Sequence, residues 1–312
     1  MNAPDVLVAA PFPEVTMAAL DAAFTVHRLW QGVPDAVLAR VRGMAASTLA
    51  GPVGAAQLAR LPALEIIANF GVGYDNIDIA LAVARGIVVT NTAGVLDEEV
   101  ADLTLGLLLA TLRRIPAAER FVREGRWVQG AFALSPSLRG RRVGIVGLGG
   151  IGKAVARRLD AFAVEIAWHG RSDQPDVAWP RYASVEALAQ ACDVLIVIVP
   201  GGAATRQLID ARVLSALGRQ GVLINVSRGT VVDETALITA LQHRTILAAG
   251  LDVFEDEPHV PAALLACDNA VLLPHIGSAS QITRQAMGQM MVDNLAAWFA
   301  TGAALTPVAE TR

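Results

Sequence analysis

The chain has 312 residues, of which 54% are hydrophobic and 17% charged, and its formal net charge is −4 at pH 7. This length suffices for two domains of ordinary size, and the composition argues against intrinsic disorder. The negative charge and the lack of basic clusters give no electrostatic signal for nucleic acid or for an anionic membrane surface. Neither is therefore expected as a partner.

Two further absences narrow the class of protein. The N-terminus has no basic segment of the kind that opens a signal peptide, and the longest apolar stretch, residues 103–112, is about half the length of a membrane span. We therefore expect a cytoplasmic protein. The two cysteines, Cys192 and Cys267, fit no metal-binding or redox spacing, so no metal site is predicted.

The first 97 residues alternate short apolar runs with helical patterns. Alternating strands and helices predict a parallel sheet that is covered on both faces. The sequence therefore predicts a small α/β domain here. Its strands are expected at 6–10, 25–29, 43–47, 64–69 and 87–90, and its helices at 14–23, 34–41, 54–61 and 77–85.

Two loops of this domain have functional interpretations. Residues 69–78 (NFGVGYDNID) follow a strand, and their glycines expose backbone N–H groups that can hold a carboxylate. The alternative is a glycine turn before a helix, with Asp75 as its cap. Residues 91–97 form either a hinge or a plain connector.

Residues 98–115 predict a long helix that is apolar on nearly all sides, with acidic residues in its first turn and Arg113 and Arg114 in its last. Such a helix is buried either in a core or in a subunit interface. Because a domain boundary lies beside it, we favour a dimer interface. Residues 120–140, which include Trp127, predict an irregular arm.

The stretch VGIVGLGGIG at 143–152 combines an apolar strand with three spaced glycines and is followed by a helical pattern. Gly147 permits a tight turn, Gly149 lets a pyrophosphate approach the backbone, and Gly152 lets helix and strand pack closely. Free N–H groups at the helix N-terminus then favour the phosphates. The sequence therefore predicts a dinucleotide site formed by Gly147, Leu148, Gly149, Gly150, Ile151 and Gly152.

Strand and helix patterns continue to alternate after this stretch, with strands expected at 164–168, 194–199, 222–226, 246–251 and 270–273. A last helix, 282–300, is expected to pack on the N-terminal domain. The predicted fold class is α/β, with two doubly wound parallel-sheet, Rossmann-like domains. The cofactor domain, residues 98–280, is inserted into a substrate domain made of residues 1–97 and 281–312.

The end of the second strand of the cofactor domain indicates which dinucleotide binds. An NAD site places a carboxylate there to bond the ribose, whereas this chain has HGRS at 169–172. Arg171 offers a planar fork suited to a 2′-phosphate, and Ser172 a hydroxyl donor. Asp173 is interpreted as a loop cap. We expect NADPH to be preferred over NADH, and the alternative is that Arg171 is a solvated loop charge.

Three later strand ends carry Arg228, Glu257 and His275. Reduction of a 2-keto acid needs a cation for the carboxylate and carbonyl oxygen, and a proton donor for the developing alkoxide. Arg228 suits the first role and His275 the second, and a carboxylate from Glu257 would favour the imidazolium and orient its ring. Taken singly, the three could be a surface ion pair, a solvated loop acid and a core histidine.

Several of these segments together resemble a known family, the D-isomer-specific 2-hydroxyacid dehydrogenases. The matching segments are 69–78, 91–96 (NTAGVL), 225–229 (NVSRG), 250–254 (GLDVF) and 275–278 (HIGS). The resemblance implies that Arg228, Glu257 and His275 are catalytic. It also implies a homodimer formed by the second domains.

The same resemblance implies the remaining contacts. The amides of Val72 and Gly73 would hold the substrate carboxylate, together with Arg228 and His275, and Asp252 would bond the nicotinamide amide. The other residues that it places beside the cofactor are Pro200, Thr205, Val226, Ser227, Arg228, His275 and Gly277.

Residues 169–172 are similar to those of the NADPH-using glyoxylate/hydroxypyruvate reductases and of the hydroxyphenylpyruvate reductases. Departures from the family pattern are Ala93, the loop 200–205 and Gly150, which stands where a basic residue is common. We predict NADPH-dependent reduction of small 2-keto acids such as glyoxylate and hydroxypyruvate to D-2-hydroxy acids. The alternatives are an aromatic keto acid such as 4-hydroxyphenylpyruvate, decided by pocket walls near Leu49, Ala50 and Trp127, or a non-catalytic NAD(P)-sensing protein similar to transcriptional corepressors.

Overall fold

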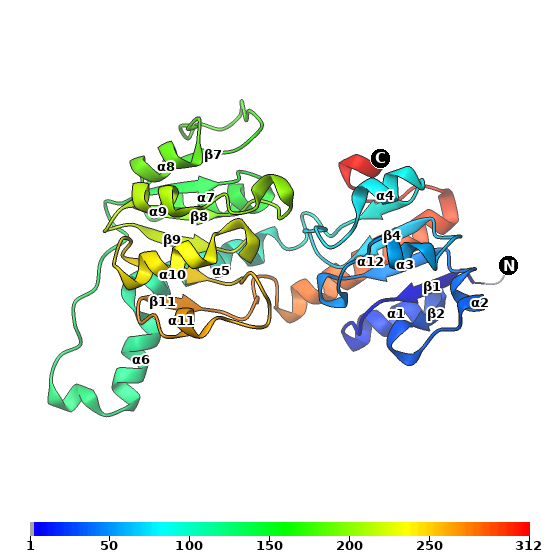
Figure 1. The fold of residues 1–312 in the computed structure, drawn as a ribbon, viewed down its shortest axis with the longest axis horizontal. Helices are drawn as coiled ribbons and strands as arrows, with labels where there is room; N and C mark the ends of the chain where they lie inside the picture. Colours follow the sequence, from blue (N-terminus) through cyan, green and yellow to red (C-terminus); the bar gives the residue numbers. More distant parts are fainter. Residues whose placement is uncertain (1–2) are drawn as a thin grey trace. The chain divides into compact units, whose positions relative to one another are not determined.

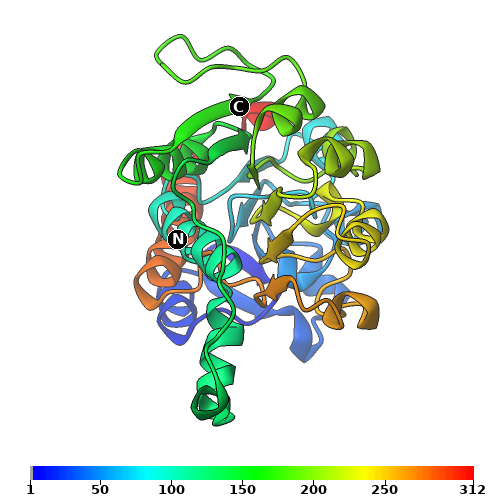
Figure 2. The same ribbon diagram turned by 90° about the vertical axis from the view of Figure 1, so that its left-hand side faces the viewer.

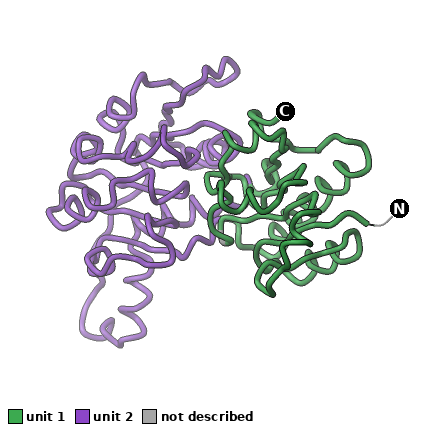
Figure 3. The backbone as a smooth tube through the Cα atoms, turned by 45° about the vertical axis from the view of Figure 1, so that its right-hand side comes forward, with its two compact units in different colours: residues 1–96, 278–312 green, residues 97–277 purple. Residues whose placement is uncertain are grey.

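A computed structural model describes residues 3–312, apart from the side chain of Leu49. The chain divides into two compact units (Figure 3): unit 1 is Met1–Leu96 with Ser278–Arg312, and unit 2 is Asp97–Gly277. Unit 2 is thus inserted into unit 1. The ranges expected from the sequence differ from these units by one residue at the first boundary and by three at the second. Within residues 3–312, none of the helices has the length and hydropathy of a membrane span.

Unit 1 is built on a five-stranded sheet in which every pairing is parallel, in the order β2-β1-β3-β4-β5. This is the flavodoxin-like order of doubly wound folds. β1, β3 and β4 are almost wholly buried, as expected for parallel strands covered on both faces. The five predicted strands are confirmed: β1 (Asp5–Val8), β2 (Thr25–Arg28), β3 (Gly43–Ala46), β4 (Ile66–Asn69) and β5 (Val88–Thr90).

Two groups of helices cover this sheet. α12 (Gln281–Thr301) packs on β4 and against α1 (Glu14–Ala23), which confirms that the last helix belongs to the N-terminal domain. The other group contributes side chains to a shared core with β1, β3 and β4, and Val308 of the C-terminal segment joins it. This group consists of α2 (Asp35–Leu38), α3 (Ala55–Ala59) and α4 (Ile79–Ala84).

Unit 2 holds a six-stranded parallel sheet in the order β11-β10-β9-β8-β6-β7. A single parallel bridge from Trp168 to Arg181 extends it beyond β7, so the order is that of a dinucleotide-binding fold whose outermost strand is reduced to one residue pair. The strands are β6 (Arg142–Val146), β7 (Glu165–His169), β8 (Val194–Val197), β9 (Val222–Asn225), β10 (Ala248–Leu251) and β11 (Ala270–Leu272).

Separate hydrophobic cores lie on the two faces of this sheet. One includes the buried side chains of α5 (Asp97–Arg113) and α7 (Gly150–Asp160). The other includes those of α8 (Val185–Ala191), α9 (Ala211–Leu217), α10 (Glu234–Gln242) and α11 (Ala262–Leu265). The two layers of helices are visible in Figure 1. The long apolar helix is therefore a core helix of unit 2.

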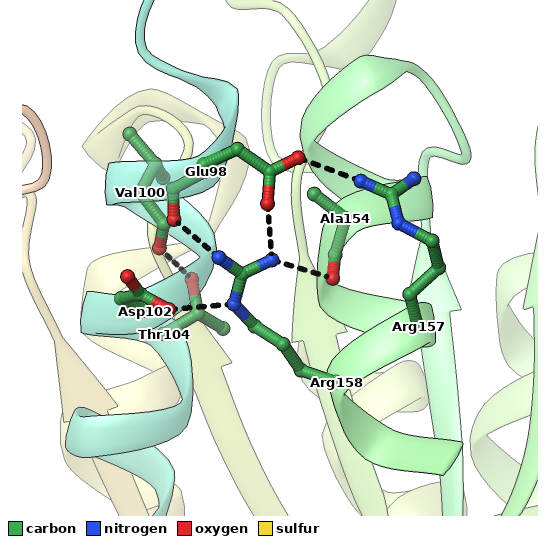
Figure 4. A network of polar contacts seen from close by, with 7 residues as sticks. All are labelled: Glu98, Val100, Asp102, Thr104, Ala154, Arg157 and Arg158. Atoms are coloured by element: carbon green, nitrogen blue, oxygen red, sulfur yellow. Dashed lines mark hydrogen bonds and ion pairs between the residues drawn. The ribbon is translucent and has the colours of Figure 1, made fainter. Parts of the chain in front are cut away.

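Charged groups join α5 to α7 on the outer side of these helices (Figure 4). The guanidinium of Arg158 bonds to the carboxylates of Glu98 at 2.7 Å and Asp102 at 2.6 Å, and to the carbonyls of Glu98 and Ala154 at 3.1 Å each. Arg157 adds a second ion pair with Glu98 at 2.6 Å. Hydrogen bonds to Asp102 outweigh the effect of burial and raise the pKa of Arg158. The network ties the helix that follows the glycine loop to the first helix of unit 2.

The segment after α5 differs from its prediction. α5 ends at Arg113 because Arg114 adopts a left-handed conformation (φ 54°), and Pro116 then lies in the first turn of α6 (Ile115–Arg123), which was expected to be part of α5 and of an irregular arm. A 3₁₀ turn, η3 (Arg126–Gln129), follows. In Figures 1 and 2, α6 and the chain after it extend away from the sheet of unit 2.

Candidate active site

The glycine loop after β6 is closely packed at two of its three spaced glycines. A Cβ at Gly147, where φ is +99°, would lie 2.3 Å from the carbonyl oxygen of Ile198, and one at Gly152 would lie 2.2 Å from that of Gly147. Both positions therefore require glycine. A Cβ at Gly149 would meet nothing within 4 Å, so the middle glycine borders open space.

α7 begins at Gly150, and no side chain caps its N-terminus at Gly149. The first N–H groups of a helix have no intrahelical partner, so those of Gly150, Ile151 and Gly152 are available to an anion. Open space at Gly149 beside these amides is the geometry that a pyrophosphate needs. The loop therefore fits a dinucleotide.

Gly150 lies close to the side chain of Asp97. A Cβ here would lie 2.0 Å from Oδ2 of Asp97, the first residue of α5. A side chain at this position would therefore require the carboxylate of Asp97 to move. With glycine here, the loop presents backbone amides and the positive end of the helix dipole.

The segment after β7 lies beside the glycine loop, since β6 and β7 pair in parallel as far as Val146 and His169, and the N–H of Gly147 donates to the carbonyl of His169 at 2.8 Å. Arg171 and Ser172 are exposed in this segment. Among residues 3–312, Arg171 makes no side-chain ion pair. Both residues therefore follow β7, the second strand of unit 2, where dinucleotide-binding folds recognise the ribose or its 2′-phosphate.

Arg181 was missed by the sequence analysis. Its guanidinium donates to the carbonyl of Gly170 at 2.7 Å, forms an ion pair with Asp173, and stacks over the ring of Trp168 at 5.5 Å. Asp173 is thus paired with Arg181, and no hydrogen bond from a backbone N–H to its carboxylate is found among residues 3–312. The only signal available in the sequence was a lone basic residue beyond the loop, which does not identify a partner.

Two loops at the ends of β8 and β9 are closed by their own side chains. Thr205 Oγ1 donates to the carbonyl of Pro200 at 2.6 Å, and the side chain of Asn225 accepts from the N–H and the hydroxyl of Ser227 while donating to the carbonyl of Arg228 at 3.0 Å. These loops follow strands on the β8 side of the β6–β8 switch point, where doubly wound sheets bind their ligands. Val226 directly follows β9, between Asn225 and Ser227.

The three residues predicted to be catalytic lie together in unit 2. Nδ1 of His275 is 2.6 Å from Oε2 of Glu257, whose other oxygen accepts from the N–H of Phe254 at 3.0 Å. The loop of Arg228 packs closely on this turn, because a Cβ at Gly229 would lie 1.8 Å from the carbonyl carbon of Phe254. The structure thus brings together the ends of β9, β10 and β11.

The charges around Glu257 keep it ionised. Burial by itself would raise the pKa of this carboxyl, but the hydrogen bond and charge of His275, the N–H of Phe254 and the charge of Arg228 together hold it below its usual value of 4.5. At neutral pH, Glu257 is therefore a carboxylate that accepts a hydrogen bond from His275.

Asp252 holds the backbone around His275. Its two carboxylate oxygens accept from the N–H groups of Ile276 and Gly277 at 2.8 Å each, and its carbonyl accepts from the N–H of His275 at 2.9 Å. His275 adopts a left-handed conformation with φ 52°. Burial raises the pKa of Asp252, and the two amides and the charge of His275 offset only part of this. The expected contact with a nicotinamide amide stays a prediction.

Val72 and Gly73 lie in unit 1, in the loop after β4. Among residues 3–312, neither N–H donates to another group of the chain. Of the pocket walls suggested by the sequence, the side chain of Leu49 lies outside the part that the structure describes. Unit 2 thus carries all predicted cofactor and catalytic residues, and unit 1 carries the two amides.

Three proteins with similar sequences are named as reductases. Glyoxylate/hydroxypyruvate reductase A of Arabidopsis thaliana is 44% identical over 313 residues, covering 99% of this chain and 100% of that protein. Hydroxyphenylpyruvate reductase of Plectranthus scutellarioides is 42% identical, with the same coverage. A 2-ketogluconate reductase of Gluconobacter oxydans is 40% identical and covers 98% of both chains.

A similar fold is seen in a crystal structure of an NADPH-dependent glyoxylate/hydroxypyruvate reductase from Sinorhizobium meliloti in complex with NADP and malonate. That protein is 53% identical, with a TM-score of 0.95 over 99% of this chain and 98% of its own. Residues 105–277 match the family model described as D-isomer specific 2-hydroxyacid dehydrogenase, NAD binding domain. The chain therefore belongs to the D-isomer specific 2-hydroxyacid dehydrogenase family.

Proposed function

We propose that this protein is an NADPH-dependent reductase that converts small 2-keto acids, glyoxylate and hydroxypyruvate first among them, to D-2-hydroxy acids. The observation that carries the proposal is the Glu257–His275 pair at 2.6 Å, with the charge of Arg228 beside it, in the same unit as the glycine loop. Relatives named glyoxylate/hydroxypyruvate reductases support this substrate class.

His275 is assigned the role of proton donor. When bound, NADPH supplies the hydride that reaches the carbonyl carbon. Since Nδ1 of His275 faces Glu257, Nε2 is the ring nitrogen that remains to give its proton to the carbonyl oxygen, which becomes the hydroxyl. Glu257 orients the ring through its contact with Nδ1.

Arg228 and the amides of Val72 and Gly73 are assigned to substrate binding. The guanidinium offers charged donors to the carboxylate and the carbonyl oxygen, where negative charge develops during reduction. The two N–H groups have no other partner among the described residues, which suits a carboxylate.

The preference for NADPH over NADH rests on the segment after β7. Arg171 is exposed there without an ion pair among the described residues, and Arg181 occupies the nearby carboxylate of Asp173. A 2′-phosphate therefore meets a cation and Ser172 rather than an unpaired acid. The relative of known structure with NADP bound supports this preference.

We also propose a homodimer formed through unit 2. The arm after α5 exposes apolar side chains that a monomer would leave in water: Trp127 is 67% exposed, Val128 92% and Leu134 99%. Large apolar side chains exposed in one segment are typical of an interaction surface. Light scattering on the purified protein tests this, with Val128→Asp expected to shift a dimer towards monomer, and a wild-type monomer at micromolar concentration would contradict it.

Initial rates of NADPH and NADH oxidation with glyoxylate, hydroxypyruvate and 4-hydroxyphenylpyruvate test the activity. Fast NADPH-linked turnover of the two small acids, lost in His275→Ala, is the expected result. Faster turnover of the aromatic acid would favour the activity that names the Plectranthus relative. No turnover despite tight NADPH binding would leave a nucleotide-sensing protein as the better account.

A further inference from the structure

The loop that presents the two unbonded amides has its carbonyl groups tied to the interior of unit 1. The carbonyl of Gly71 accepts from the N–H of Thr92 at 3.1 Å and from Nδ2 of Asn69 at 3.2 Å. The carbonyl of Val72 accepts from Nδ2 of Asn91 at 2.9 Å. Each of these carbonyls therefore has a set direction.

These carbonyl bonds also determine where the amides point. In a planar trans peptide the C=O and the N–H lie on opposite sides of the chain. The N–H of Val72 therefore points away from the donors that hold the carbonyl of Gly71. The N–H of Gly73 likewise points away from the side chain that holds the carbonyl of Val72.

Asn91, whose side chain holds the carbonyl of Val72, has its own backbone bonded to the C-terminal segment. The hydroxyl of Thr306 donates to the carbonyl of Asn91 at 2.6 Å, and the N–H of Asn91 donates to the carbonyl of Thr306 at 3.3 Å. Thr306 therefore bonds both the carbonyl and the N–H of Asn91.

Asn294 anchors Thr306 to α12. Its Nδ2 donates to the hydroxyl of Thr306 at 3.0 Å and to the carbonyl of Met290 at 2.8 Å, and its Oδ1 accepts from the N–H groups of Leu305 and Thr306 at 3.0 and 2.9 Å. The side chain is 1% exposed and uses both donors and both acceptor positions. A buried, fully bonded amide of this kind defines one geometry.

We propose that Asn294 and Thr306 are positioning residues that, through Asn91, aim the Gly73 N–H at the substrate carboxylate. The inference rests on the proposed role of Val72 and Gly73 and assigns the reason for their orientation to residues more than 200 positions away in sequence. Hydrogen bonds weaken steeply with misalignment, so loss of this support lowers substrate affinity without removing any group that contacts substrate.

The test compares three variants of the C-terminal segment. Thr306→Val keeps the shape but removes the hydroxyl, and Thr306→Ser restores it. Thr311→Val is the matched control, because Thr311 bonds the backbone of Val89 in β5 and not the loop. Each is measured for KM and kcat with glyoxylate, for malonate binding as a carboxylate probe, for NADPH affinity and for melting temperature.

Thr306→Val is expected to raise KM and the malonate dissociation constant about tenfold, with NADPH affinity unchanged. Thr306→Ser and Thr311→Val are expected to stay close to wild type. If Thr306→Val alters only the melting temperature, the residue is structural and the inference is wrong. If it does not fold, Asn91→Asp, which removes the donor to Val72, replaces it in the same measurements, with the same outcomes.

Gly73→Pro separates this inference from the proposed function, because it removes the N–H itself. Retained malonate binding in Gly73→Pro would show that this amide does not hold the carboxylate. Loss of binding in Gly73→Pro, with normal binding in Thr306→Val and Asn91→Asp, would overturn only the positioning role.

Discussion

Nδ1 of His275 lies 2.6 Å from Oε2 of Glu257, across 18 positions of sequence. The carboxylate is held by two donors, since its other oxygen accepts from the N–H of Phe254. The histidine backbone is held by Asp252. Both partners are therefore constrained before any substrate binds, which is the preorganisation that proton transfer requires.

Glu257→Gln is expected to lower kcat about 100-fold with little effect on NADPH affinity. The amide keeps the shape but turns an N–H towards Nδ1, which disfavours the imidazolium that donates the proton. Steady-state kinetics measure the change. Glu255→Gln on the same turn is the control, because Glu255 pairs with Arg206 instead of the histidine, and an equal loss in both variants would contradict the assignment.

The same carboxyl makes stability depend on pH. Because the folded-state pKa of Glu257 lies below its usual 4.5, its contribution to stability is full above that value and is lost as the pH falls through the lower folded-state pKa. The free energy of unfolding of the wild type relative to that of Glu257→Gln is expected to shrink as the pH falls below 4.5. Denaturant titrations at several pH values measure it, and a difference that grows on acidification would refute the assigned direction.

Arg171→Ala is expected to weaken NADPH binding by roughly ten- to a hundredfold, since a charge-assisted hydrogen bond contributes about 1.5–3 kcal/mol. NADH affinity should hardly change, because NADH has no 2′-phosphate. Titration of both cofactors measures this. Arg212→Ala, which removes an exposed arginine paired with Asp210 on α9, is the control. If Arg171→Ala weakened the binding of NADPH and NADH equally, Arg171 would not recognise the 2′-phosphate.

Gly229→Ala is expected to destabilise the protein by several kcal/mol, on the order of 3 or more, and to abolish activity. Its Cβ would overlap the backbone at Phe254, where the loop of Arg228 meets the turn of Glu257. Gly106→Ala is a control for which the opposite effect on stability is expected. A Cβ at this exposed helical position meets nothing within 4 Å. It is expected to stabilise by about 0.5–1 kcal/mol. Thermal denaturation and activity distinguish the two.

Much of the architecture was predictable because it is encoded locally. Apolar runs of strand length and the alternation of strands with helices predicted both parallel sheets, and the glycine spacing at Gly147, Gly149 and Gly152 predicted the turn that the structure shows. The predicted strand boundaries lie within two residues of the observed ones, because strands buried on both faces form clear apolar runs in the sequence. The break at Arg114 was missed, since one left-handed residue has little sequence signal.

The sequence by itself determined which residue types stand at the strand ends, and hence the kind of chemistry. The bond between Glu257 and His275 was expected from the sequence, and the tertiary structure decided its geometry. Two other contacts were decided by the tertiary structure alone: the ion pair of Asp173 with Arg181, eight positions along the chain, and the hydrogen bonds of Thr306 with Asn91, 215 positions apart. Their partners depend on sheet order and loop packing, and sequence spacing carries no information about either.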